Sequence, residues 1–254
     1  MARTIPAERF AAVVAAAARV FVTHGYQRAQ IQDVADVLGL GKGTLYGYAR
    51  SKAALFAAAV RYADGHEPLP APADLPVPAP ADGETAQLVT TRLAAVISDL
   101  NLTHALAGPL TASAEPAELA GIVTDLYQRL AQHRTAIKLV DRCAPELAEL
   151  AEVWFGAGRH AQVSALAEYL TRHEHAGTLT LPGPAALVAR TIIELCTLWA
   201  VHCHFDPAPT PADADPIDDS AVAAMLAALV VRATTPVQTL ATAAAPPATR
   251  PPAS

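Results

Sequence analysis

Cysteine, lysine and aromatic residues are scarce in this sequence. Its 254 residues include three cysteines and three lysines, and aromatic side chains make up 5% of the chain. Cys196 and Cys203 stand seven positions apart in an expected helix, roughly 10 Å along its axis, which is too far for a disulfide. The cysteines therefore form no disulfide framework of the kind found in secreted domains, and we expect a cytoplasmic location.

Strand patterns are also nearly missing. Runs of Val, Ile, Thr and aromatic residues with a period of two are almost absent, whereas alanine, the strongest helix former, fills 59 positions. This composition argues against sandwiches, barrels and sheet-based nucleotide folds, and it predicts an all-α fold. The apolar stretch 185–203 contains two charged residues and the stretch 221–231 is short, so we expect no membrane span. Arginines flank the apolar run 10–18, so we expect no signal peptide either.

Charge is divided unevenly along the chain. Residues 1–64 carry eight basic and four acidic side chains, whereas the remaining residues carry ten basic and twenty acidic ones. This asymmetry indicates a basic module that binds a polyanion, joined to an acidic module with another role.

Proline and glycine divide the chain into about nine expected helices. Their expected ranges are 6–24, 31–38, 42–48, 51–64, 84–106, 116–144, 145–173, 184–205 and 219–232. The segment 65–83 holds six prolines and almost no periodic signal, so we expect it to be a semi-rigid connector. It would separate a head, residues 1–64, from a larger domain, residues 84–235. The tail 236–254 consists largely of Ala, Thr and Pro, and we expect it to be disordered.

Residues 31–55 carry the most informative pattern. Two short helices joined by a tight turn at Gly39 predict a helix-turn-helix, whose second helix enters the major groove of DNA. Leu45 is expected to face the shared core, which leaves Lys42, Thr44 and Tyr46 on the outer face. Basic, hydroxyl and phenol groups suit contacts with phosphate oxygens.

Four strings in the head resemble the DNA-binding domain of TetR-family transcriptional regulators. They are Gly25-Tyr26, Ile31–Ala35, Gly41–Tyr48 and Ser51–Leu55, and the resemblance covers about residues 5–64. It implies nine or ten helices, an all-α ligand-sensing domain and dimerisation through the last two long helices. The DNA-binding residues that it implies are Gln30, Lys42, Gly43, Thr44, Tyr46, Gly47, Tyr48 and Lys52.

The head departs from the family pattern at several positions. Gln30 replaces the usual Thr or Ser at a helix N-cap, and Gly41 replaces the usual Ser before the recognition helix. Gly47 stands where a base-reading side chain is common, and Ala49 replaces an aromatic residue. Glycine inside a helix costs about 1 kcal/mol in stability. Because Gly47 also has no side chain that could donate a hydrogen bond to a base, we expect recognition to depend partly on DNA shape. The alternative hypothesis is an all-α module that binds a small molecule or a protein and whose head has lost useful DNA affinity.

Polar side chains on otherwise apolar helices are candidates for a ligand pocket. For each of them the alternative is a core position or an ion pair, such as Glu194 with Arg190 one helical turn away. Their mixture indicates a largely apolar pocket for a hydrophobic or cationic small molecule. The candidates are Asn101, His104, Tyr127, Trp154, Arg159, Glu194, Trp199 and His202.

The expected helix 184–205 is apolar around nearly its whole circumference, which indicates burial on all sides. In a domain of this size, a second copy of the chain would supply one wall. The candidate dimer-interface residues, which lie on this helix and on the last one, are Leu195, Leu198, Met225, Leu226 and Leu229.

Motifs for catalysis are missing. The sequence has no Gly-x-Ser-x-Gly, no P-loop, no dinucleotide-binding glycine motif and no His-Glu-x-x-His. His202-Cys203-His204 lacks a second ligand pair at helical spacing, so we expect no metal and no cofactor. The sequence thus predicts a non-enzymatic regulator, a ligand-released repressor of neighbouring genes. Its expected partners are a near-palindromic DNA operator, a second copy of itself and an unknown small-molecule effector, and no membrane.

Overall fold

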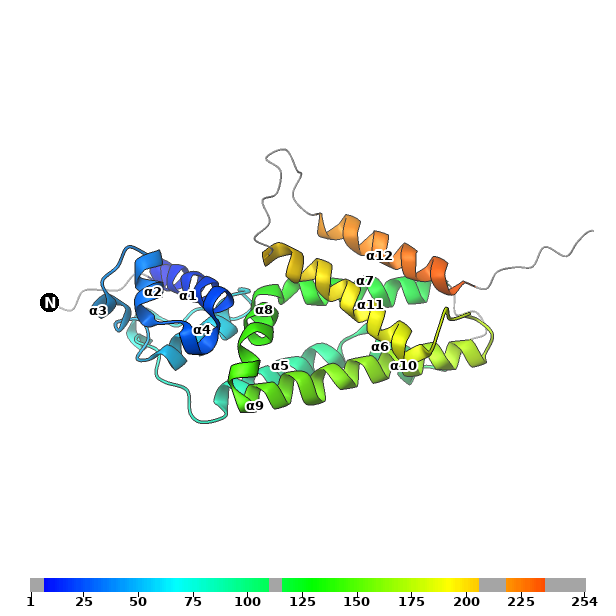
Figure 1. Cartoon of the computed structure of the whole chain (residues 1–254), viewed down its shortest axis with the longest axis horizontal. Helices are drawn as coiled ribbons and strands as arrows, with labels where there is room; N and C mark the ends of the chain where they lie inside the picture. The colour runs from blue at the N-terminus through cyan, green and yellow to red at the C-terminus, as the bar shows by residue number, and fades with distance from the viewer. Residues whose placement is uncertain (1–6, 110–115, 206–217, 236–254) are drawn as a thin grey trace, which may run out of the picture.

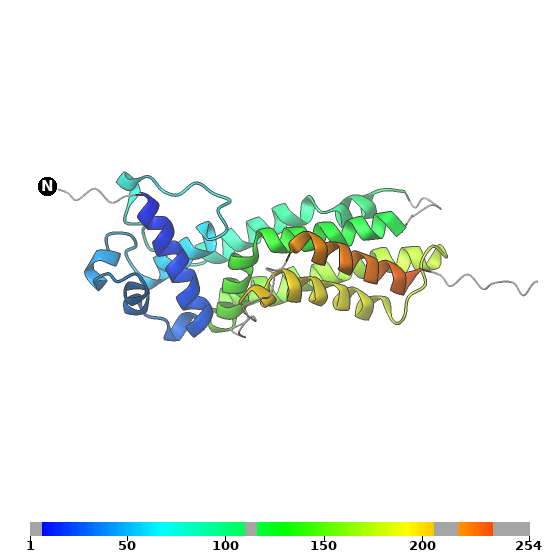
Figure 2. The same cartoon turned by 90° about the horizontal axis from the view of Figure 1, so that it is seen from above.

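The computed structural model describes residues 7–109, 116–205 and 218–235. Within these ranges the regular elements are helices, apart from one isolated β-bridge, and the all-α prediction is confirmed. The expected disordered tail, residues 236–254, lies outside the described residues. Figures 1 and 2 show an elongated molecule with the N-terminal helices at one end and the long later helices at the other.

The head contains four helices. They are α1 (Ala7–Arg28), α2 (Ile31–Val37), α3 (Lys42–Leu45) and α4 (Lys52–Tyr62). Helix α1 changes direction at Gly25, which has a positive φ of 77°. Ser51 is the N-cap of α4, because its hydroxyl accepts a hydrogen bond from the Ala54 amide at 3.0 Å.

The rest of the described chain is built from longer helices and short linking turns. The first are the 3₁₀ turn η1 (Pro72–Asp74), α5 (Glu84–Ser98), α6 (Asn101–Ala107), α7 (Pro116–Gln132) and α8 (Arg134–Cys143). They are followed by η2 (Ala144–Glu146), α9 (Ala148–Ala151), the π-helical η3 (Glu152–Gly158), α10 (Arg159–His175), α11 (Ala185–Ala200), η4 (His202–Phe205) and α12 (Asp219–Thr234).

Three helices expected to be continuous are interrupted. The expected helix 84–106 breaks between α5 and α6, where Leu100 is extended and buried and the Asp125 carboxylate accepts the Asn101 amide at 2.9 Å. The expected helix 116–144 breaks at His133. There the Asp64 carboxylate accepts the amides of Thr135 and Ala136, both at 2.9 Å. Both capping carboxylates are far away in sequence, so local periodicity carried no sign of either break.

The expected helix 145–173 is also irregular. It begins with short turns and contains the π-helical stretch η3, which includes Gly156 and Gly158. Such π-helical segments often lie at functional sites.

Two clusters of buried side chains form the core. The first joins the head to α8 and its neighbours, since Phe21, Leu45 and Leu55 of the head belong to the same cluster as Leu139 and Cys143. The second lies between α7, α10, α11 and α12. The head is therefore packed directly on the following domain.

The segment Ala185–Phe205 is long and apolar enough to cross a membrane by length and composition alone. In this fold α11 instead packs against α7, α10 and α12, and it contributes Ile192, Ile193 and Cys196 to the second core. Packing inside the helical domain accounts for the apolar character of one side of this helix, but Leu187 and Leu198 are 62% and 45% exposed, so the expected burial on all sides is not found within one chain.

Candidate nucleic-acid interface and ligand cavity

The turn around α3 presents polar side chains outward. Leu45 is 1% exposed and anchors α3 to the core, as predicted. Lys42, Gly43 and Thr44 are exposed on the opposite side, and the Tyr46 side chain is 44% exposed. This surface has the amine, hydroxyl and phenol groups that contact DNA phosphates and base edges.

Two of the predicted DNA contacts are placed differently. Tyr48 is 2% exposed, so its ring belongs to the core of the head and not to the outer surface. The Lys52 Nζ donates to the carbonyls of Tyr26 and Gln27 at 3.0 and 3.2 Å and lies 4.7 Å from the centre of the Tyr26 ring. Because this ammonium binds the C-terminal end of α1, the structure assigns Lys52 a structural role in the head.

The hydrogen bonding of Gln30 and the secondary structure at Gly47 also differ from what the sequence indicated. The Gln30 amide donates to the Asp33 carboxylate at 2.7 Å, which stabilises the start of α2 while the Gln30 side chain remains exposed. Helix α3 ends at Leu45, so Gly47 lies in the following turn and the expected cost of glycine inside a helix does not apply. The exposed Arg50 lies in the same turn and was not among the predicted contacts.

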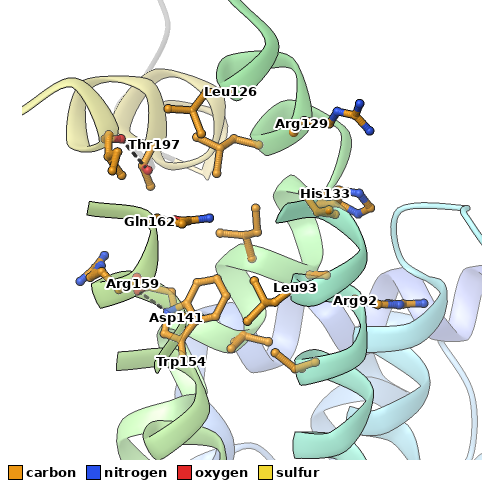
Figure 3. Close-up of a pocket in the computed structure, with 18 of the residues that line it drawn as sticks. Arg92, Leu93, Leu126, Arg129, His133, Asp141, Trp154, Arg159, Gln162 and Thr197 are labelled. Carbon is orange, nitrogen blue, oxygen red and sulfur yellow. Dashed lines mark hydrogen bonds between the residues drawn. The ribbon is translucent and has the colours of Figure 1, made fainter. Parts of the chain in front are cut away.

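A cavity of about 110 Å³ lies between α4, α5, α7, α8, η3, α10 and α11. Its lining is mainly apolar, with Val89, Leu93, Val140 and Ile193 among the walls. Figure 3 shows Trp154 and Arg159 beside Asp141 on one side of the cavity, with Gln162 above them. The Trp154 indole donates to the Asp141 carboxylate at 3.1 Å, which orients the ring.

Of the predicted pocket residues, Trp154 and Arg159 line this cavity, and the other six do not. Tyr127 is fully buried, and its hydroxyl donates to Asp219 at 2.8 Å; burial and this carboxylate raise its pKa. Glu194 pairs with Arg190 at 2.6 Å, the alternative that we considered. The remaining predicted residues outside the cavity lining are Asn101, His104, Trp199 and His202.

His202 has a different role from the predicted one. Its ring nitrogen lies 3.0 Å from the Lys138 Nζ, and burial, followed by the nearby Lys138 charge, lowers its pKa. Within residues 7–109, 116–205 and 218–235, no three His, Cys, Asp or Glu side chains gather in a way that could hold a metal ion.

Six polar lining residues were missing from the predicted set. They are Arg92, Arg129, His133, Asp141, Gln162 and Thr197. The sequence held one signal for this wall of the cavity, a set of lining residues at helical spacing along one face of α8. They are His133, Ala136, Ile137, Val140 and Asp141.

The arginines of the cavity are paired with acids. Arg92 pairs with Glu67, and Arg159 lies 4.0 Å from Glu194. Arg129 pairs with Asp99 at 2.6 Å and with Asp125 at 3.2 Å. Burial and the neighbouring His66 lower the pKa of His133, which favours its neutral form. The cavity therefore presents little uncompensated positive charge.

The same cavity touches the end of α4. Val60 of α4 is one of the lining residues. The Arg92 guanidinium donates to the carbonyls of Val60 and Arg61, both at 2.7 Å. These bonds satisfy carbonyls at the C-terminal end of α4, and Asp64 just beyond it caps α8. A wall of the cavity thus holds the helix that carries the head.

The last two long helices expose an apolar face. Leu198 of α11 is 45% exposed, and Met225 and Leu229 of α12 are 46% and 50% exposed. Leu195 is partly buried against the second core. Leu226 is 2% exposed, so its predicted place in a dimer interface is wrong: its side of α12 faces the protein's own core.

Comparisons with known proteins agree with this arrangement. The model for bacterial regulatory proteins of the TetR family matches residues 13–59, and the model for the C-terminal domain of AefR-like transcriptional repressors matches residues 122–229. A comparison with curated proteins gave no match.

Several solved structures are similar. The ketosteroid transcriptional regulator KstR2 of Mycobacterium tuberculosis has 15% identity and a TM-score of 0.55, over 93% of this chain and 100% of that one. A transcriptional regulator from Streptomyces coelicolor has 22% identity and a TM-score of 0.44, over 88% of this chain and 96% of that one. A TetR-family protein from Rhodococcus RHA1 has 18% identity and a TM-score of 0.47, over 88% and 95%.

The first of these structures shares the fold, and the two family models together cover more than half of the chain. Their matches include both the head with the outward-facing α3 and most of the helical domain around the cavity. The chain therefore belongs to the TetR family of bacterial regulatory proteins, which are DNA-binding regulators of transcription.

Proposed function

We propose that this protein is a cytoplasmic homodimeric repressor that leaves a near-palindromic operator when a small molecule enters the cavity. Two heads would place their α3 turns in successive major grooves. Lys42, Thr44 and Tyr46 would contact the duplex, together with Gln30, Gly43, Gly47 and the exposed Arg50. The exposed apolar face that carries Leu198, Met225 and Leu229 supports pairing of two copies.

The observation that carries this proposal is the contact between the cavity wall and α4. Arg92 lines the cavity and holds the last carbonyls of α4, while α4 packs against α1 inside the head. A ligand that displaces Arg92 or widens the gap between α5 and α8 would move α4. Repression would end if the ligand binds more tightly to the conformation in which the heads are wrongly spaced for DNA.

The lining favours an uncharged, mostly apolar ligand over a cationic one. Each arginine has an acidic partner, and the Asp141 carboxylate accepts the Trp154 indole, so a charged ligand would lose its hydration beside an apolar wall without a free partner. The amide of Gln162 offers both a donor and an acceptor to one polar group of a ligand. An apolar cavity of about 150 Å³ accommodates benzene. The present cavity is smaller, about 110 Å³, so a short alkyl chain would fit as it stands and a ring would enter only by moving its walls apart.

Three probes of nearly the same shape test both parts of the proposal. Benzyl alcohol is neutral, benzylamine is cationic and benzoate is anionic at pH 7. We expect benzyl alcohol to raise the melting temperature saturably and to release the protein from a duplex selected from a random-sequence pool. The two charged probes should bind at least about tenfold more weakly, because their charges must be desolvated beside apolar walls.

A cavity-filling variant is the matched control. Ile137→Phe should remove the effect of benzyl alcohol on the melting temperature and on release while leaving duplex binding in place. Equal responses to the three probes would contradict the ligand class. Failure of the wild-type chain to bind any duplex would contradict repression and favour a module whose head has lost its DNA affinity.

A further inference from the structure

The proline-rich segment is attached to the DNA-reading turn. We call residues 65–80 the proline strap; six of them are prolines. The sequence predicted a semi-rigid connector between two modules; in the structure the strap also pairs with the turn that follows α3. The Val77 amide donates to the Tyr48 carbonyl at 2.9 Å, and the Arg50 amide donates to the Val77 carbonyl at 3.0 Å. These two bonds form a parallel bridge between Val77 and Ala49.

Apolar side chains and an ion pair also hold the strap. Leu69, Leu75 and Val77 pack against the core of the head. Near its start, Glu67 pairs with Arg92 and the His66 ring lies 2.8 Å from the Gln132 carbonyl. The strap is therefore fixed to the cavity wall near its start and to the recognition turn further along, and it then leads into α5. Figures 1 and 2 show the segment between α4 and α5 as a long extended loop.

Between these attachment points the strap does not close onto α4. A groove of about 230 Å³ remains between them, lined by Ala54, Ala58 and Arg61 of α4 and by Pro70 and Pro80 of the strap. The bridge and the apolar anchors, rather than continuous packing, hold the strap in register with the head.

Helix α3 needs such support because it is short. Its four residues, Lys42–Leu45, make only one turn, and a helix of this length is not stable without tertiary contacts. Leu45 fixes one side of it to the core. The turn Tyr46–Arg50 fixes its C-terminal end, and the strap supplies two of the backbone hydrogen bonds of that turn.

We propose that the proline strap is a positioning segment for DNA recognition, with Val77 as its positioning residue. It does not contact DNA itself. Through its backbone it holds the turn that carries Tyr46 and Arg50 at the angle needed in the major groove.

Val77→Pro tests this inference because proline has no amide hydrogen to donate to Tyr48. The matched control is Ala79→Pro, two residues further along the strap and outside the bridge. Both variants would be measured with the full-length chain and the duplex selected by the wild-type protein. We expect Val77→Pro to raise the Kd about fivefold to tenfold and to speed hydrogen exchange of the Arg50 amide, with Ala79→Pro close to wild type.

Val77→Asp provides a second variant, which keeps the amide but places a carboxylate where the side chain packs against the core. It should weaken duplex binding in the same direction. Circular dichroism and the melting temperature would verify that each variant is folded. Faster exchange at Arg50 with an unchanged Kd would overturn the inference, and so would unchanged exchange in Val77→Pro. A wild-type chain that binds no duplex would overturn the proposed function and this inference together.

Discussion

Gly25 shows how a single residue joins the head to the rest of the molecule. Its φ of 77° and ψ of 175° lie in a region that essentially only glycine adopts. A Cβ built there would clash with the Glu146 carboxylate and would meet the Arg142 guanidinium at 2.7 Å. That carboxylate accepts the Gln27 amide, so the turn at the end of α1 is built around the absence of a side chain.

We expect Gly25→Ala to lower the free energy of unfolding by about 1–3 kcal/mol, because alanine is strained at this φ and ψ. Urea unfolding followed by circular dichroism would measure the loss. Gly121→Ala is the control, since Gly121 is inside α7 with open space around a built Cβ, and alanine there should stabilise by up to about 1 kcal/mol. Equal effects of the two substitutions would be inconsistent with this explanation.

Lys42 and Lys52, the two lysines of the head, are not equivalent in the structure. Lys42 is exposed beside Thr44, whereas the Lys52 ammonium is bound to two carbonyls at the end of α1. A lysine that contacts phosphate contributes to the salt dependence of DNA binding through counterion release.

We expect Lys42→Ala to weaken operator binding and to reduce the slope of log K against log salt concentration by about one. Lys52→Ala should instead lower the melting temperature and leave this slope nearly unchanged. Anisotropy titrations at several salt concentrations would separate the two. A reduced slope for Lys52→Ala alone would reverse the assignment.

At the scale of elements, the junction of α1 with α8 and η2 holds the head in place. Glu146 of η2 accepts the Gln27 amide at 2.5 Å and the Arg142 guanidinium at 3.0 Å. The bond from Gln27, and then the Arg142 side chain, hold the pKa of Glu146 below its ordinary value near 4.5. Beside it, burial raises the pKa of Cys143 to about 12, so this thiol remains protonated at neutral pH.

A carboxyl group whose pKa is lower in the folded state stabilises the fold above its unfolded pKa. The contribution of Glu146 should therefore be complete at pH 7 and decline as the pH falls below about 4.5. We expect Glu146→Gln to destabilise the protein at pH 7 and to match wild type more closely at pH 3.5. Urea unfolding at both pH values would measure this, with Glu149→Gln as the control. A difference that stays constant with pH would contradict the prediction.

The helices illustrate what could be predicted from the sequence at this scale. Helical spacing was sufficient for α1, α2 and α4, because this signal is local. The breaks at Leu100 and His133 were not predictable in this way. Asp125 caps the start of α6 and Asp64 caps the start of α8, and the tertiary fold brings both carboxylates to these positions.

At the scale of the whole molecule, the exposed apolar face of α11 and α12 is the feature that a single chain leaves unexplained. Leu198, Met225 and Leu229 are each close to half exposed, whereas Ile192, Ile193, Leu226 and Val230 on the other side of these helices are buried. Burial of this face against a second copy would place two heads on the same duplex.

We expect the double variant Leu198→Glu, Leu229→Glu to be monomeric in sedimentation experiments, because paired carboxylates would be desolvated in the interface. Operator affinity should fall by about a hundredfold or more, since each head would bind alone. Ala94→Glu, at an exposed position of α5, is the control. A dimer that persists in the double variant would place the interface elsewhere.

The sequence by itself determined the helical class, the outward-facing α3 and the family, because alanine content, helical spacing and the motif around Lys42 are local properties of the chain. Only the tertiary structure decided which polar residues line the cavity, that Tyr48 is buried in the head, that the Lys52 ammonium is bound to the end of α1, and where the proline strap lies. Each of these depends on contacts between residues distant in sequence. Spacing along one helix does not encode such contacts.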